Sequence, residues 1–239
     1  AAAGIAPILG ASVTTADAGS VVLLARDGDG YAGLCRILSQ AHLAGERAAP
    51  ISDVARICGD ARGLSAILGP ASGPGALART GRPTAALRAL EPFRDAFGDR
   101  LRIGIEQRLE ASSRDEIRSL LALAARAEVA PVATNPVRYL VRSDAFLADA
   151  LACIRDLVPI SERNVRRRNA EGWLKPERGM RDLFRERPEL LEASVAVAEE
   201  CSFDLDLHRL RFPRFEVPTG GSADGVLAER CEAGARRRG

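Results

Sequence analysis

The sequence of 239 residues predicts an α/β fold that is followed by an all-helical segment. Apolar, strand-like runs alternate with helix-like stretches as far as about residue 135, and this alternation is typical of a parallel α/β sheet or barrel. From residue 143 onwards the pattern predicts helices, apart from a proline-bounded, extended stretch at 209–218. We therefore predict two regions, an α/β region over 1–158 and a helical region over 159–239.

Five short apolar runs are the expected strands. Continuous runs of Val, Ile, Leu and Ala are typical of strands that are covered on both faces. The expected strands are 4–13, 20–25, 63–68, 101–107 and 129–134.

Helix signals lie between the first three strands. Asp27 or Asp29 is expected to cap a helix that ends at Gly45. Ser52 is expected to cap a short helix that runs through Cys58.

Proline and glycine divide the next part of the chain. Residues 69–83 are rich in Gly, Pro and Ser and are expected to be mostly loop. Pro83 suits the first turn of a helix that stops at Gly98, and Pro92 is expected to kink this helix.

The remaining helices follow from capping and periodicity. Ser113 and Glu116 fit a capping box at the start of an amphipathic helix. The later helices are expected at 143–156, about 177–185, 188–201 and 222–236.

The composition is that of an ordinary soluble protein. Hydrophobic residues make up 46% and charged residues 28%, and the net charge of +2 argues against a basic nucleic-acid surface over the whole chain. The basic residues are Arg apart from Lys175, and Ala is abundant, which indicates the codon usage of a GC-rich genome. No apolar run approaches the length of a membrane span, so no membrane partner is expected.

The five cysteines indicate a reducing compartment. They are widely spaced and contain no C-x-x-C pair, which argues against a disulfide framework and against a zinc site. We expect buried thiols and a cytoplasmic protein. The start of the chain has no basic region, so no signal peptide is expected. Residue 1 is Ala and Met180 is the only methionine, so we expect a piece of a longer protein or a processed product.

Few residues suit catalysis or metal binding. The two histidines, His42 and His208, have no clustered partner, and a surface or core role is expected for each. Glu106 stands alone in a strand, where a local hydrogen-bond or ion-pair role is expected. No phosphate-binding glycine loop, dinucleotide fingerprint or serine-nucleophile elbow is present.

One stretch, residues 163–181, concentrates basic charge beside Trp173. Phosphate contact is one interpretation of this pattern, and a solvated helix face or loop is the other. The candidate nucleic-acid-binding residues are Arg166, Arg167, Arg168 and Lys175.

An ordered set of motifs resembles a known family. "PILGAS", "VVLLARDGDGYAGLCRILSQAHLAGE", "VATNPVRYL", "WLKPERGMRDLFRERPELLEASVAVAEEC" and "RFPRFEVP" follow the order found in bacterial C-family DNA polymerases. This family contains the replicative polymerase III alpha subunits and their error-prone relatives, and the helix after "VVLLA" and the "RFPRFEVP" linker look most like the error-prone branch. The resemblance implies a partial, distorted PHP (polymerase and histidinol phosphatase) β/α barrel, followed by a helical connection to the polymerase core.

The resemblance also implies where metal ligands would stand. The family's "TNDVHY" loop carries Asp and His where this chain has Pro136 and Arg138. The glutamate after "LGA" corresponds to Ser12, a histidine to Ser20, and a cysteine to Pro70. We therefore expect a PHP-like scaffold with no metal and no catalytic residue in this segment.

Three functions follow from these observations. The first is a segment of an error-prone, translesion-type DNA polymerase in DNA replication and damage repair. Its parent would use Mg²⁺, a DNA primer-template and deoxynucleotides, and would dock protein partners of a translesion complex. The second is an active PHP phosphoesterase or nuclease. The third is a non-catalytic interaction module from a truncated gene.

Overall fold

The computed structural model describes residues 4–46, 49–161, 163–165, 167, 169–205, 216–217 and 221–238. The chain forms two compact units, Ala1–Phe203 and Asp204–Gly239. The second unit contains helix α9 (Ala223–Arg238), which confirms the predicted last helix. The stretch at 209–218 lies outside the described residues, apart from 216 and 217.

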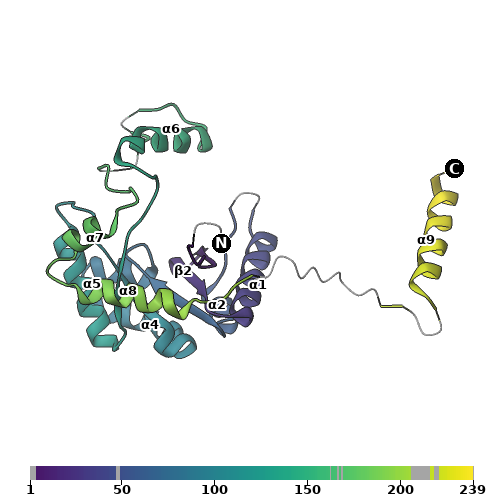
Figure 1. Ribbon diagram of the computed structural model, residues 1–239, viewed down its shortest axis with the longest axis horizontal. Helices are drawn as coiled ribbons and strands as arrows, with labels where there is room; N and C mark the ends of the chain where they lie inside the picture. Colours follow the sequence, from purple (N-terminus) through teal and green to yellow (C-terminus); the bar gives the residue numbers. More distant parts are fainter. Residues whose placement is uncertain are drawn as a thin grey trace. The chain divides into compact units, whose positions relative to one another are not determined.

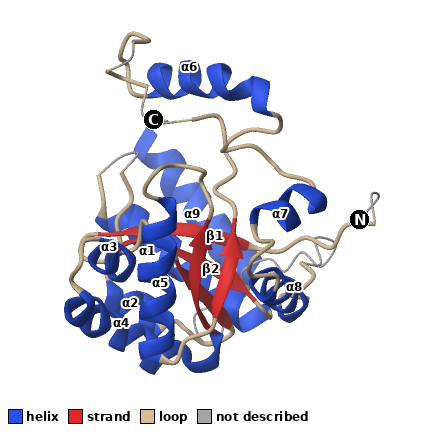
Figure 2. Cartoon of the chain, turned by 90° about the vertical axis from the view of Figure 1, so that its left-hand side faces the viewer, coloured by secondary structure: helices blue, strands red, loops and turns tan. Residues whose placement is uncertain are grey.

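A five-stranded sheet forms the centre of the first unit (Figure 2). The strands are β1 (Gly10–Thr15), β2 (Gly19–Ala25), β3 (Leu64–Leu68), β4 (Leu101–Glu106) and β5 (Pro131–Thr134), and they lie in the order β1-β2-β3-β4-β5. All five expected strands are confirmed. The first begins later than predicted, and the preceding residues contain Pro7, which has no amide donor for a sheet.

The sheet is mixed, so the expectation of a parallel sheet is correct only in part. β3, β4 and β5 pair in parallel, whereas β2 is antiparallel to both β1 and β3. A short turn joins β1 to β2 and therefore forces an antiparallel pair. Gly19 closes this turn with a φ of 63°, and a Cβ at this position would lie 2.4 Å from the Ala71 carbonyl oxygen.

Helices α1 (Gly28–Ala44) and α2 (Val54–Gly59) form where they were predicted, but the predicted N-cap of α2 is wrong. The Asp27 side chain accepts a hydrogen bond from Gly30 N, as expected. The α2 cap is Asp53 and not Ser52. Ser52 lies one residue too early to cap the helix, and its amide donates to the Thr14 carbonyl at 2.9 Å and extends the edge of the sheet.

The expected loop at 69–83 contains a helix, α3 (Gly73–Arg79). Ser72 caps it, since its hydroxyl accepts from Gly75 N at 3.2 Å and donates to the Gly69 carbonyl at 2.7 Å. Pro74 is tolerated because the first turn of a helix needs no amide donor there. The prediction of mostly loop was therefore wrong for these seven residues.

Two longer helices complete this region. α4 (Pro83–Phe97) begins and ends as predicted and continues through Pro92. α5 (Ser113–Ala127) is present, but the predicted capping box is wrong. Ser113 is buried and its hydroxyl accepts from Glu110 N, while Glu116 accepts a hydrogen bond from the Ser112 hydroxyl. Short 3₁₀ turns lie at Gly98–Arg100 and Arg142–Asp144.

The remaining helices of the first unit are α6 (Ala145–Arg155), α7 (Glu177–Leu183) and α8 (Glu189–Glu200), which confirms three predicted helices. Figure 2 shows the strands between the α1–α5 group and α8. Side chains that include Leu23, Leu64 and Ile103 form the core on the first face. Ile67, Val132 and Val197 form a smaller cluster beneath α8 on the other face.

Helix α8 is attached to the sheet by polar contacts as well. The Ser194 hydroxyl donates to the Ala133 carbonyl of β5 at 2.9 Å. Glu200 pairs with Arg102 at 3.2 Å and with Arg26 at 3.7 Å. Helix α8, which follows residue 158 in the sequence, thus packs on the sheet that precedes it. The division into domains at 158/159 stays a prediction.

Candidate functional site

Of the five positions at which the resemblance places metal ligands, four lie at one edge of the sheet, and the fifth, Ser12, lies within β1 and contacts Ser20. The carboxyl ends of parallel strands meet at the same edge, so Pro70 after β3 lies on the same side as Pro136 and Arg138 after β5. β2 runs the other way, which brings its first residues to this edge. The Ser20 amide donates to the Ala71 carbonyl at 3.1 Å and joins β2 to the loop that contains Pro70.

Ser12 and Ser20 contact each other directly. Their hydroxyl oxygens lie 2.7 Å apart, although Ser20 is paired with Thr14 in the strand register. This is a diagonal contact between side chains on one face of an antiparallel pair. Two neutral hydroxyls therefore stand where the resemblance places a glutamate and a histidine.

A pocket of about 290 Å³ lies beside the carboxyl ends of β4 and β5. Its lining includes Ala71, Glu106, Arg108, Pro136, Arg138 and Asn169. Glu106 accepts from Arg108 Nε at 2.8 Å, which confirms its expected role as an ion-pair partner. The Asn169 amide donates to the Arg108 carbonyl at 2.8 Å, so residues far apart in the sequence close this pocket.

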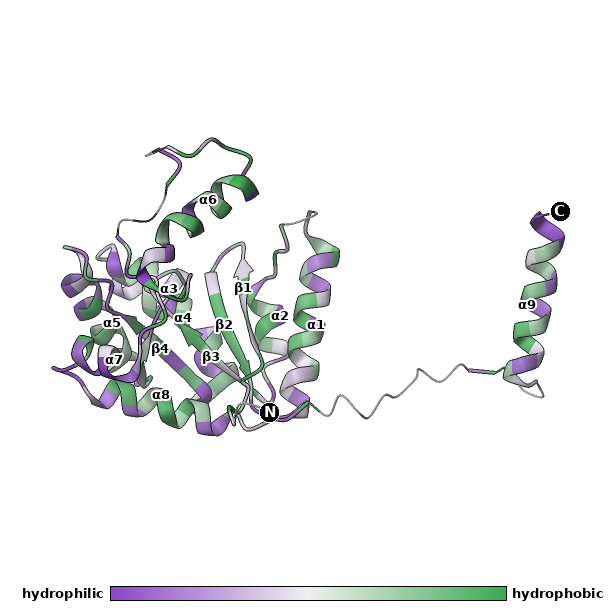
Figure 3. Ribbon diagram, turned by 45° about the horizontal axis from the view of Figure 1, so that its top comes forward, coloured by the Kyte–Doolittle hydropathy of each residue, from purple (hydrophilic) through white to green (hydrophobic). Residues whose placement is uncertain are grey.

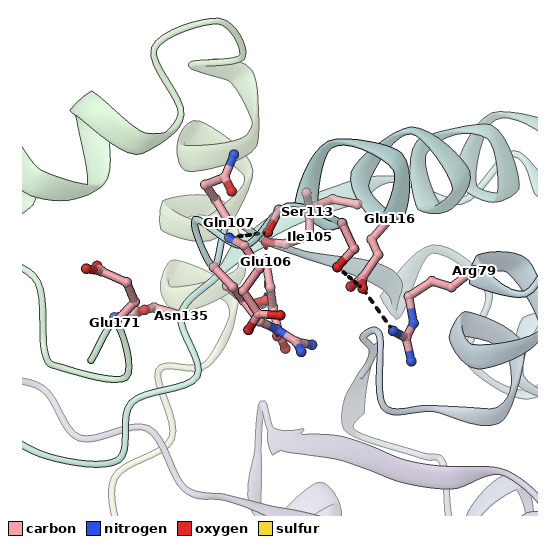
Figure 4. A network of polar contacts seen from close by, with 12 residues as sticks. Arg79, Ile105, Glu106, Gln107, Ser113, Glu116, Asn135 and Glu171 are labelled. Carbon is pink, nitrogen blue, oxygen red and sulfur yellow. Dashed lines mark hydrogen bonds and ion pairs between the residues drawn. The ribbon is translucent and has the colours of Figure 1, made fainter. Parts of the chain in front are cut away.

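A second polar group lies at the start of α5. Figure 4 shows Glu116 reaching toward Arg79, and their closest atoms are 3.2 Å apart. The Ser112 hydroxyl donates to the same carboxylate oxygen of Glu116 at 3.0 Å. This group connects α3 to α5 and is structural.

The loop after β5, residues 135–140, is held against residues 172–174. The amides of Arg138 and Tyr139 donate to the Gly172 carbonyl at 2.7 and 3.2 Å. The Leu174 amide donates in return to the Tyr139 carbonyl at 3.0 Å. The Arg138 side chain forms no ion pair with any residue in the described ranges.

Lys175 is one of the predicted nucleic-acid contacts, and its side chain is 3% exposed. Its ammonium group donates to the Glu171 carbonyl and to Asn135 Oδ1, and it lies 3.6 Å from a carboxylate oxygen of Glu171. Glu171 also pairs with Arg142. Burial lowers the pKa of Lys175, and the charge of Arg142 lowers it further. A phosphate would have to compete with these contacts.

Arg167 is the other predicted contact that the structure places. Its Nε lies 2.6 Å from Asp149 Oδ2, and the Asp149 side chain is 8% exposed. Arg166 and Arg168 lie outside the described residues. Nucleic-acid binding by this group stays a prediction. Sequence reasoning missed Asp149 and Glu171, because neither carries a local motif that shows its distant partner.

The histidines and the other possible metal ligands are scattered. His42 lies in the last turn of α1, and His208 lies outside the described residues. Where the structure is described, no three side chains of the types His, Cys, Asp and Glu gather as metal ligands. In the same part of the chain, every helix is too short or too polar to cross a membrane.

The cysteines differ from one another in burial. Cys153 and Cys201 are buried, as expected, whereas Cys35 and Cys231 are exposed, so the expectation of buried thiols is wrong for these two. Cys58 is intermediate, and burial together with the charge of Asp95 raises its pKa to about 11.

No family model matches the chain. Several curated proteins that are similar to it are named error-prone DNA polymerase. An error-prone DNA polymerase of Symbiobacterium thermophilum is 30% identical over 255 residues, which cover 99% of this chain and 23% of that polymerase. The error-prone DNA polymerase of Mycolicibacterium paratuberculosis is 36% identical over 231 residues, covering 91% of this chain and 20% of the polymerase.

A third relative extends this result. The error-prone DNA polymerase of Pseudomonas paraeruginosa is 32% identical over 240 residues, covering 97% of this chain and 21% of the polymerase. The chain thus spans about a fifth of the length of these relatives. The resemblance that the motifs indicated is confirmed: nearly the whole chain is similar to one segment of bacterial error-prone DNA polymerases.

Proposed function

We propose that the chain is a segment of an error-prone, translesion-type DNA-directed DNA polymerase that acts in DNA replication and damage repair. One observation supports this function above all, namely similarity over nearly the whole chain to several proteins named error-prone DNA polymerase. The parent protein would bind a primer-template and deoxynucleotides in the cytoplasm. Its nucleotidyl transfer would use Mg²⁺ ions held by carboxylates outside this segment.

Within that polymerase, the sheet edge with Ser12, Ser20, Pro70, Pro136 and Arg138 would be the remnant of a PHP metal site. The side chains at this edge do not fit a metal ion. Proline has no donor atom, and the two serine hydroxyls are hydrogen-bonded to each other. A guanidinium repels a nearby cation by about 4 kcal/mol per unit charge pair at ~4 Å and an effective dielectric of ~20. The role of this edge would be packing and partner docking.

Primer extension by the full-length product of the gene tests the proposed function. With Mg²⁺, the polymerase should extend a primer past a damaged template base and misincorporate more often than a replicative polymerase. A product that folds and fails to extend any primer would contradict the proposal.

The second candidate is a non-catalytic module from a truncated gene. The separate core of the first unit favours it, because this core is built within Ala1–Phe203. The test is thermal unfolding of the chain as it stands, since an independent module should unfold in one cooperative transition. A broad, non-cooperative transition would exclude this candidate.

The third candidate, an active PHP phosphoesterase or nuclease, requires a bound metal ion. Elemental analysis and phosphoester hydrolysis with added Mn²⁺ test it. A metal-free, inert protein would exclude it.

A further inference from the structure

Helix α6 buries its small and acidic side chains and exposes its large apolar ones. Ala145, Asp149 and Cys153 are buried and lie at helical spacing on one side. The large side chains Phe146, Leu147, Leu151 and Ile154 are 57–68% exposed. An amphipathic helix of a complete globular unit has the reverse arrangement.

The inward side of α6 is fixed by specific contacts. Asp149 pairs with Arg167 at 2.6 Å and its side chain is 8% exposed, so turning it outward would break an ion pair whose carboxylate is buried. The Cys153 carbonyl accepts a hydrogen bond from Val158 N at 3.0 Å, which closes the end of the helix. Because Ala145, Asp149 and Cys153 face inward, the large apolar side chains on the other side of the helix face outward.

The apolar surface continues beyond the helix. Leu140 before α6 and Leu157 after it are 65% and 91% exposed. A groove of about 690 Å³ runs beside the helix, and Leu140, Leu147 and Leu151 line it. We call the exposed side chains of Leu140, Phe146, Leu147, Leu151, Ile154 and Leu157 the α6 surface. Figure 1 shows α6 standing apart from the sheet, and Figure 3 shows its apolar colouring.

We propose that the α6 surface is an intramolecular interface, on which an apolar face from the remaining part of the polymerase chain packs. This inference rests on the proposed function. Contiguous exposed apolar patches mark interaction sites, and this one is held outward by the Asp149–Arg167 pair. The relatives are four to five times longer than this chain, so a full-length polymerase contains the polypeptide that would cover it.

Thiol labelling of Leu151→Cys tests the interface. The substitution is made in this chain alone and in a full-length chimera, in which this chain replaces the matching segment of the Mycolicibacterium paratuberculosis polymerase. Leu43→Cys is the matched control, because Leu43 is an 87% exposed leucine on a different helix, α1. Mass spectrometry gives the labelling rate of each cysteine with a maleimide.

The proposal predicts that labelling at position 151 is at least ten times slower in the chimera than in the chain alone, while labelling at position 43 is unchanged. Equal rates at position 151 would overturn it. Protection that appears in the chain alone and disappears on dilution would show a second copy as the occupant, and would also overturn it. Primer extension by the same chimera reports the proposed function separately from this interface.

A second measurement needs no chimera. The triple substitution Phe146→Ser, Leu151→Ser and Ile154→Ser is made in this chain, and binding of a hydrophobic dye is compared with the unsubstituted chain. Dye binding should fall by more than half, with the midpoint of thermal unfolding unchanged. A large fall in the midpoint would show that these side chains are packed within the chain itself, which would overturn the proposal.

Discussion

The hydroxyl oxygens of Ser12 and Ser20 lie 2.7 Å apart on neighbouring strands, at the sheet edge that Pro70, Pro136 and Arg138 share. Two side chains that are eight residues apart in the sequence thus share one hydrogen bond. This contact supports the proposal that the edge holds no metal ion, because hydroxyls that bind each other are less available to a ligand.

Metal binding is expected to appear when the five positions receive the ligands that the family resemblance implies. The change is Ser12→Glu, Ser20→His, Pro70→Cys, Pro136→Asp and Arg138→His together. The unsubstituted chain should bind Mn²⁺ weakly, whereas the restored chain should bind at least about tenfold tighter, a gain of ~1.4 kcal/mol. Isothermal titration calorimetry measures both.

The matched control for this experiment is Arg138→Gln alone, which removes the repelling charge and adds no strong ligand. Tight Mn²⁺ binding by the unsubstituted chain would contradict the proposed loss of the metal site.

Removal of Arg167 is expected to destabilise the first unit. Arg167→Ala leaves the Asp149 carboxylate, which is 8% exposed, without its partner. The free energy of unfolding should fall by about 1–3 kcal/mol, the usual cost of an unsatisfied buried polar group. Denaturant unfolding measures this, with exposed Arg178→Ala as control. Equal stabilities of the two variants would show that the ion pair contributes nothing.

Cys58 is expected to make stability fall at alkaline pH. Its folded pKa is raised to about 11 from an ordinary value of 9.0, so the unfolded chain releases the thiol proton first. Between these two values the folded state binds more protons than the unfolded state, and the free energy of unfolding decreases as pH rises. Cys58→Ala should reduce this decrease, as measured by denaturant unfolding from pH 8.5 to about 11. An unchanged pH dependence would contradict the assignment to Cys58.

The cap of α3 is expected to contribute measurably to stability. Ser72 is fully buried and makes two hydrogen bonds, one to the backbone of Gly69 and one from that of Gly75. Ser72→Ala should lower the free energy of unfolding by about 1–2 kcal/mol. Ser119→Ala, which removes an exposed hydroxyl from α5, should have a much smaller effect. The same loss in both variants would argue against capping by Ser72.

Much of the secondary structure could be predicted from the sequence. The apolar runs gave all five strands, because the core side chains of a sheet lie next to one another in sequence. The α3 helix was missed because its first three residues are Gly, Pro and Gly, although Ser72 and Pro74 are proper start signals. The antiparallel β2 was missed because apolar runs carry no information on strand direction.

The candidate site could be predicted only as far as the family resemblance reached. The resemblance selected Ser12, Ser20, Pro70, Pro136 and Arg138, but it gave no contacts among them. Two ion pairs, Glu106–Arg108 and Asp149–Arg167, differ in whether their sequence separation allows them to be predicted. Partners two residues apart can be foreseen from a sequence, whereas partners 18 residues apart depend on how the chain folds.

Sequencing the DNA on both sides of this coding segment tests the proposed function most directly. We predict one open reading frame, in which upstream sequence supplies the first part of a PHP-like domain and downstream sequence supplies the paired carboxylates of a polymerase palm. Stop codons or unrelated sequence on both sides would contradict it, and the chain would then be a remnant without polymerase activity.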